Sequence, residues 1–191
     1  PAELMTDDDH NRRAFFREIF KRVVDPVAAY AEQRLPQART LLRPPGALPE
    51  SAFLDTCYRC GNCADSCPVE AIQHSQSDDE TQRGTPVILP DSQPCIACEG
   101  LHCMAACPSG ALVPTPLTQL AMGLAHVDAT TCKRSSGDDC RLCFDACPTP
   151  EKALSIDATD PPVVHAEHCI GCGLCQHVCP TAPKAIVVHP A

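Results

Sequence analysis

The sequence predicts an α+β chain in which two small units, built from short β-hairpins and small helices, follow an N-terminal helical arm. Three observations lead to this prediction. Sixteen cysteines fall into four regularly spaced groups, all of them after residue 56. Twenty prolines against nine glycines favour short elements joined by stiff turns. The segment before the cysteines shows apolar residues at helical spacing.

The arm is expected to cover residues 6–43, with an amphipathic helical segment over 10–35. Apolar residues recur on one face from Phe15 to Val27, while basic residues occupy much of the remaining surface. Such a face needs a cover, which is expected to be a partner subunit, a membrane surface or the chain's own body. Prolines in residues 44–52 predict a stiff linker after the arm.

The arginine pair Arg12-Arg13 and the phenylalanines after it resemble the core of a twin-arginine export signal. Export also requires about 7–15 consecutive apolar residues, but Arg17 and Glu18 interrupt the stretch that follows. We therefore expect a cytoplasmic protein, with residues 1–5 interpreted as a cloning remnant ending in the natural start, Met5. No run approaches the roughly 18 apolar residues of a membrane span, so any membrane contact is expected to be peripheral.

Charge is distributed unevenly along the chain. Residues 1–43 hold eight of the fifteen basic residues and seven of the twenty-four acidic residues. The formal charge of −9 therefore combines a segment of +1 with a cysteine-rich part of −10. An acidic body argues against a nucleic-acid partner and is suited to docking on positive patches of redox proteins.

The first and last cysteine groups have identical spacing: Cys57-x2-Cys60-x2-Cys63-x3-Cys67-Pro68 and Cys169-x2-Cys172-x2-Cys175-x3-Cys179-Pro180. This is the C-x2-C-x2-C-x3-C-P run of bacterial ferredoxins, in which three thiolates hold one 4Fe–4S cluster and the fourth ligates the neighbouring cluster. The other two groups are stretched inside the loop but keep the same ending: Cys95-x2-Cys98-x4-Cys103-x3-Cys107-Pro108 and Cys132-x7-Cys140-x2-Cys143-x3-Cys147-Pro148.

Four complete sets of four cysteines predict four 4Fe–4S clusters in two dicluster ferredoxin units, over residues 53–118 and 119–191. A small helix is expected after each Cys-Pro pair. Short apolar strands are expected at residues 86–89, 124–127, 153–156, 162–165 and 185–188.

Other uses of the cysteines fit this spacing less well. Zinc sites use paired C-x2-C knuckles and have no role for a third cysteine two residues on. Disulfides are disfavoured because no secretion signal is evident. The sequence shows no nucleotide-binding loop, flavin motif or non-cysteine metal group, so no catalytic residue is predicted and catalysis is assigned to a partner.

Two pairings of the groups are open. Sequential pairing joins group one with two and group three with four, and is favoured because neighbouring elements usually pack together. Nested pairing joins one with four and two with three. The sequential sets are Cys57, Cys60, Cys63, Cys107; Cys95, Cys98, Cys103, Cys67; Cys132, Cys140, Cys143, Cys179; and Cys169, Cys172, Cys175, Cys147.

With all four spacings in this order, the chain resembles the ferredoxin-type proteins of periplasmic nitrate-reductase and methylamine-utilisation operons. The segment from Cys95 to Leu112 is especially similar to their second motif. The resemblance covers about residues 53–188. It implies that all sixteen cysteines are cluster ligands and that the protein moves electrons toward a respiratory or dehydrogenase enzyme, or takes part in that enzyme's maturation.

An electron-transfer protein or subunit is the leading functional hypothesis, because four clusters in so short a chain must lie close together. The alternative is a maturation factor that docks to an apo-metalloenzyme, with the clusters supporting cofactor insertion. A third interpretation gives the clusters a mainly structural role. In each case the expected partner is a redox protein, docked through residues 10–35.

Overall fold

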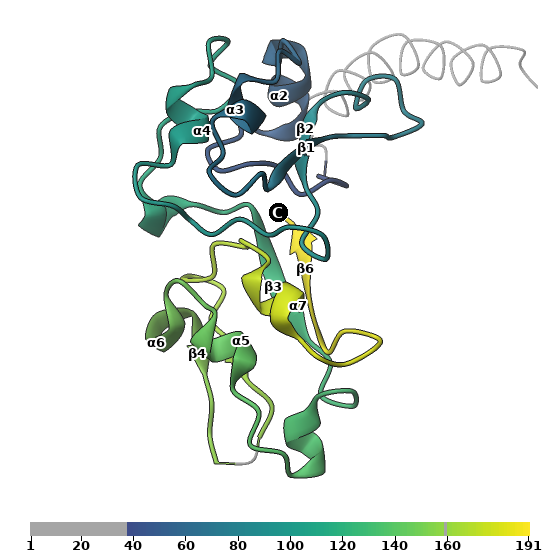
Figure 1. Cartoon of the computed structure of the whole chain (residues 1–191), viewed down its shortest axis with the longest axis vertical. Helices are drawn as coiled ribbons and strands as arrows, with labels where there is room; N and C mark the ends of the chain where they lie inside the picture. Colours follow the sequence, from purple (N-terminus) through teal and green to yellow (C-terminus); the bar gives the residue numbers. More distant parts are fainter. Residues whose placement is uncertain (1–37, 159) are drawn as a thin grey trace, which may run out of the picture. The chain divides into compact units, whose positions relative to one another are not determined.

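Short helices and two-stranded ladders alternate along the chain in the computed structural model (Figure 1). The structure describes residues 38–158 and 160–191. The expected helical arm over residues 10–35 and the interpretation of residues 1–5 therefore lie outside the described residues. No helix in the part that is described is long and apolar enough to cross a membrane.

The elements follow one another in two similar runs. The first run contains α2 Glu50–Thr56, α3 Asn62–Asp65, β1 Ile72–His74, β2 Pro86–Ile88 and α4 His102–Ala105. The second begins with the 3-10 turns η1 Leu117–Gln119 and η2 Lys133–Ser136, which flank β3 Gly123–Val127. It continues with α5 Leu142–Asp145, α6 Pro150–Ala153, β4 Leu154–Ser155, β5 Val163–Val164, α7 Leu174–Val178 and β6 Ile186–Pro190.

Strand pairing repeats between the two runs. β1 pairs antiparallel with β2, and β4 pairs in the same way with β5. β3 pairs with β6, with Leu124 opposite His189, and an antiparallel bridge between Ala47 and Leu112 takes the corresponding place in the first run. The five expected strands lie within about two residues of β2 to β6, whereas β1 was not expected.

Helices form in a different place from the one expected. After the Cys-Pro pair, a helix follows only in the third group, where α6 begins at Pro150; turns and bends follow the other three pairs. The short helices α3, α4, α5 and α7 instead begin one residue before the third cysteine of each group and end before the fourth. The three intervening residues are enough for one helical turn, so the spacing itself favours a helix there.

The buried side chains form one hydrophobic core that both runs share. It includes Phe53, Ile88, Leu112, Met122 and Ile186 together with several cysteines. The runs meet closely enough that the backbone N–H of Met122 donates to the carbonyl of Ile170 at 3.1 Å.

Glycine is required at the closest approach between the two runs. Gly171 has a φ of +70°, and a Cβ at this position would lie 2.2 Å from the backbone nitrogen of Gly123. Any larger residue would push β3 away from the loop of the fourth cysteine group.

The compact unit begins earlier than the expected end of the arm at residue 43. It covers Gln37–Ala191, and Leu42, Arg43 and Pro44 are buried in it. α2 starts at Glu50, inside the expected linker over 44–52. Leu42 belongs to the core, and Ala47 and Leu48 pack against it. Arg43 forms a buried ion pair with Glu50, which a solvated linker would not do.

Candidate cofactor sites

The third cysteine of every group is the second residue of a short helix. These cysteines are Cys63 in α3, Cys103 in α4, Cys143 in α5 and Cys175 in α7. α3 and α7 are each preceded by a glycine in left-handed conformation, Gly61 with φ 85° and Gly173 with φ 88°. Glycine adopts this conformation without steric cost, so it permits the sharp turn from the loop into the helix.

The sixteen cysteines line four cavities, four to each. We number each cavity after the group that supplies three of its cysteines. Cavity 1 is lined by Cys57, Cys60, Cys63 and Cys107; cavity 2 by Cys95, Cys98, Cys103 and Cys67. Cavity 3 is lined by Cys132, Cys140, Cys143 and Cys179; cavity 4 by Cys169, Cys172, Cys175 and Cys147.

The fourth cysteine in each cavity comes from the neighbouring group. Cys67 and Cys107 cross between cavities 1 and 2, and Cys147 and Cys179 cross between cavities 3 and 4. The grouping coincides with the sets expected from sequential pairing. Nested pairing would have brought Cys67 together with the fourth group.

Burial raises the pKa of several thiols in these cavities. Burial is the largest cause of the shift at four of them. The pKa of Cys63 and the pKa of Cys95 rise to about 11, and the pKa of Cys103 and the pKa of Cys172 rise to about 12. The charge of neighbouring cysteines raises these values further. Thiolates in such surroundings need positive charge among them.

The residues present fit an iron–sulfur cluster. Within the described ranges, no three Cys, His, Asp or Glu side chains are arranged to hold a single metal ion. Each set of four thiols instead surrounds a cavity, as ligands at the separate corners of a multi-iron cluster must. The walls between the cysteines are largely apolar; cavity 2, for example, is lined by Ile72, Ile88 and Leu101.

Several sulfur atoms accept hydrogen bonds from the chain. Backbone N–H groups donate to the sulfur of Cys67 from Ala71 at 3.3 Å and to that of Cys107 from Leu112 at 3.4 Å. Cys107 and Cys179 also contact the hydroxyls of Ser109 and Thr181, at 3.5 and 3.3 Å. Burial raises the pKa of Cys107 and Cys179, but these hydrogen bonds outweigh it, so that both pKa values are lowered.

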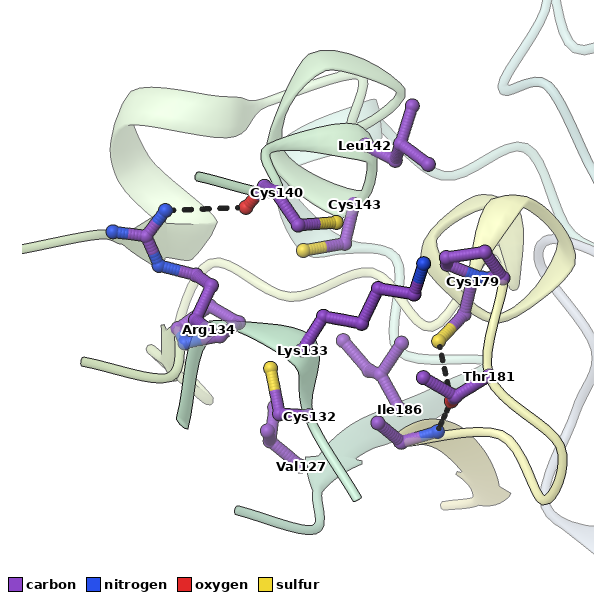
Figure 2. A pocket seen from close by; sticks show the side chains of 13 residues that line it. Val127, Cys132, Lys133, Arg134, Cys140, Leu142, Cys143, Cys179, Thr181 and Ile186 are labelled. Carbon is purple, nitrogen blue, oxygen red and sulfur yellow. Dashed lines mark hydrogen bonds between the residues drawn. The ribbon is translucent and has the colours of Figure 1, made fainter. Parts of the chain in front are cut away.

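The seven-residue segment between Cys132 and Cys140 in the third group is organised by Arg134, whose side chain is 3% exposed. Its guanidinium donates to the carbonyl oxygens of Asp160 at 2.7 Å, Ala158 at 2.8 Å and Cys140 at 3.2 Å. Figure 2 shows the bond to Cys140 at the edge of cavity 3, with the sulfur of Cys179 on the opposite side. Arg134 thus connects the backbone of Cys140, the second cysteine of this group, to the loop that follows β4.

Cavities 2 and 4 adjoin each other. The backbone N–H of Cys95 donates to the carbonyl of Cys172 at 3.0 Å. Beside it, the side-chain amide of Gln176 donates to a carboxylate oxygen of Asp91 at 3.0 Å. The two halves of the chain are therefore joined directly at two of the cysteine-lined cavities.

Sequence reasoning missed the polar residues that support the cavities. Arg43, Glu50 and Arg134 are all at most 3% exposed, and charged residues are buried this deeply only when they are paired. The residues next to Arg43, Glu50 and Arg134 in the sequence give no indication that these three are buried. The hydroxyls of Ser109 and Thr181 did have a signal, because each follows a Cys-Pro pair directly.

Comparisons with known proteins agree with this geometry. Residues 56–111 and 121–182 match the family described as "4Fe-4S dicluster domain". The methylamine utilization ferredoxin-type protein MauM of Methylobacillus flagellatus is 36% identical over 160 residues, covering 79% of this chain and 68% of that protein. MauM of Paracoccus denitrificans is 36% identical over 156 residues, covering 76% and 69%. The ferredoxin-type protein NapG of Escherichia coli is 32% identical over 180 residues, covering 85% and 78%.

Among solved structures, a chain of the formate dehydrogenase–heterodisulfide reductase–formylmethanofuran dehydrogenase complex from Methanospirillum hungatei matches 72% of this chain and 49% of its own length. It is 22% identical, with a TM-score of 0.32. That score is too low to support an argument about the fold.

Proposed function

The chain belongs to the family of ferredoxin-type electron-transfer proteins built from 4Fe–4S dicluster domains, and we propose that each of its four cavities holds one 4Fe–4S cluster. The observation that supports the number four is the even division of sixteen cysteines among four cavities. When bound, such a cluster stores and releases single electrons at a potential set by its charge, its hydrogen bonds and its exposure.

All sixteen cysteines act as ligands in this proposal, in the sets that line cavities 1 to 4. The residues around them exclude water and orient the thiols. α3, α4, α5 and α7 each hold a third cysteine in place, and the backbone N–H groups of Ala71 and Leu112 stabilise the negative charge on sulfur.

The protein works with a redox partner that carries out the catalysis, and residues 10–35 dock to it in the cytoplasm. The acidic charge of −10 after residue 43 supports a partner with a positive docking patch. The electron-transfer function of the relatives supports this role over the maturation hypothesis.

Iron analysis of the anaerobically purified protein tests the proposal. About sixteen irons and sixteen labile sulfides per chain are expected, because each 4Fe–4S cluster contains four of each. A result near eight irons, or four zincs, would contradict four clusters.

Paired cysteine substitutions test the sets. Cys60→Ala and Cys107→Ala belong to one cavity, so the double variant should retain about twelve irons, the same as either single variant. Cys60→Ala combined with Cys67→Ala affects two cavities and should retain about eight. About eight irons in the variant that combines Cys60→Ala with Cys107→Ala would show that Cys107 does not serve the cluster of the first group.

A further inference from the structure

The residue after each Cys-Pro pair occupies an equivalent place in all four cavities. These residues are Ser109 in cavity 1, Val69 in cavity 2, Thr181 in cavity 3 and Thr149 in cavity 4. Each lines the same cavity as the cysteine two residues before it. Three of the four carry a hydroxyl group, and one is aliphatic.

Two of these hydroxyls already contact sulfur. Thr181 Oγ1 lies 3.3 Å from the sulfur of Cys179 and accepts a hydrogen bond from the backbone N–H of Ala185 at 2.8 Å (Figure 2). Ser109 likewise lies 3.5 Å from the sulfur of Cys107 and accepts from a backbone N–H at 3.3 Å. A hydroxyl has one hydrogen to donate. Because each oxygen already accepts from the backbone, that hydrogen is free to point at the sulfur.

The third hydroxyl, on Thr149, is buried and has no hydrogen-bond partner. Thr149 is the N-cap of α6, a position where a threonine side chain usually accepts a bond from the first turn, yet no such bond forms. A buried hydroxyl without a partner is destabilising. Because Thr149 lines cavity 4 beside Cys147, sulfur in that cavity is the partner available to it.

Cavity 2 differs because it has Val69 at this place. Cys67 keeps the backbone hydrogen bond from Ala71 at 3.3 Å, but no hydroxyl follows its proline. Val69 is half-buried and has nearly the shape of threonine, so this position offers a site where a hydroxyl can be added without changing the volume.

We propose that Ser109, Thr149 and Thr181 set reduction potentials by donating a hydrogen bond to cluster sulfur in cavities 1, 4 and 3, and that Val69 leaves cavity 2 without this donor. The inference rests on the proposed function. Ser109, Thr149 and Thr181 act on the reduction potential of the cluster that the cysteines hold, and they are not ligands of that cluster.

The sign of the effect follows from charge. Reduction adds one negative charge, and a donor near sulfur stabilises the more negative state, so the hydroxyl raises the reduction potential. Removing it should lower the potential of one cluster and adding it should raise the potential of another. A tenfold change in the ratio of reduced to oxidised cluster at a fixed potential corresponds to about 59 mV for a one-electron couple, and we expect shifts of this order.

The test is a redox titration of the full chain followed by electron paramagnetic resonance. Ser109→Ala, Thr149→Val and Thr181→Val should each move one midpoint down, and Val69→Thr should move one midpoint up. Thr149→Ser should restore the wild-type value because it keeps the hydroxyl. Thr118→Val removes an exposed threonine outside the cavities and should move none.

Iron content separates failure of this inference from failure of the proposed function. If a variant keeps about sixteen irons and its midpoints equal those of the wild type, the hydroxyls do not set the potentials. If Val69→Thr moves a midpoint down, the sign is wrong. If the wild-type chain itself lacks clusters, the proposed function fails first.

Discussion

Replacing Arg43 by methionine tests how the first ferredoxin unit is held together behind cavity 1. The Arg43 side chain is fully buried, and its Nε donates to both oxygens of Glu50 at 3.2 and 3.1 Å. One terminal nitrogen donates to Thr85 Oγ1 at 2.7 Å and to the carbonyl of Pro86 at 3.1 Å. The guanidinium carbon also lies 4.8 Å from the ring centre of Phe53, which lines cavity 1.

Arg43→Met is expected to lower the free energy of unfolding mainly because it leaves the Glu50 carboxylate buried without its partner. Removing one partner of a buried ion pair costs about 3–5 kcal/mol because the other charge stays buried. Arg39 Nε lies 3.8 Å from Glu50 Oε2 and retains part of the compensation, so we expect about 3 kcal/mol. Arg43→Met with Glu50→Leu removes both members of the fully buried pair and should recover part of this loss. Arg39 keeps its hydrogen bonds to the carbonyls of Ala47 and Leu48 in the double variant.

Unfolding of a cluster protein is irreversible, so the assay is a rate. Loss of the visible cluster absorbance is followed under anaerobic conditions in guanidinium with an iron chelator. A loss of about 3 kcal/mol speeds unfolding by up to about two orders of magnitude if the transition state has already lost the ion pair.

A matched surface pair provides the control. Arg141 Nε lies 3.8 Å from Asp145 Oδ1, and the two side chains are 48% and 63% exposed. Arg141 also stacks on the Phe144 ring at 4.9 Å, so Arg141→Met should cost at most about 1 kcal/mol, roughly a fivefold change in rate. If Arg43→Met unfolds within threefold of Arg141→Met, or if the double variant is no slower than Arg43→Met, the explanation by buried charge is refuted.

Three further predictions concern the clusters and the arm. Arg134→Met should lower the iron content by about four per chain, because the loop that carries Cys140 loses its anchor. Lys152→Met, at an exposed position outside the cavities, should keep all the iron, and equal iron in both variants would contradict this prediction. Chelation of iron should abolish the helix and strand signals together in circular dichroism, since cluster binding and folding are coupled; an apo-protein with an unchanged spectrum and sharp thermal unfolding would disprove the coupling. Deletion of residues 6–36 should leave the clusters intact and abolish co-purification with the partner, whereas loss of iron on deletion would assign those residues to the core.

The sequence was sufficient for the family and for the two dicluster ferredoxin units of small helices and strands. Cysteine spacing pointed to dicluster ferredoxin units, and the strands were located to within about two residues. Spacing is informative here because the ligands of one cluster must come from a short loop, which leaves little freedom in the number of residues between them. The helices after Cys-Pro pairs were expected at four places and formed at one, because α-helical geometry suited the three residues before the fourth cysteine better.

Other features depended on tertiary structure. Which groups share a cavity was open from the sequence, since sequential and nested pairing use the same cysteines; the structure brings Cys67 to the second group and Cys147 to the fourth. The burial of Arg43 was also open from the sequence, because it looks like a surface arginine until Glu50 is packed against it.

The chemistry of the sites is already present in the sequence, which sets the number of thiols, their division into four loops and the type of group they suit. How the loops meet depends on the packing of the folded chain. The contact between cavities 2 and 4 joins Cys95 to Cys172, which lie far apart in the chain. The burial of the Thr149 hydroxyl without a hydrogen-bond partner depends on the atoms that surround it. Local spacing carries no information about either, because burial and long-range contact arise only when the whole chain packs into one core.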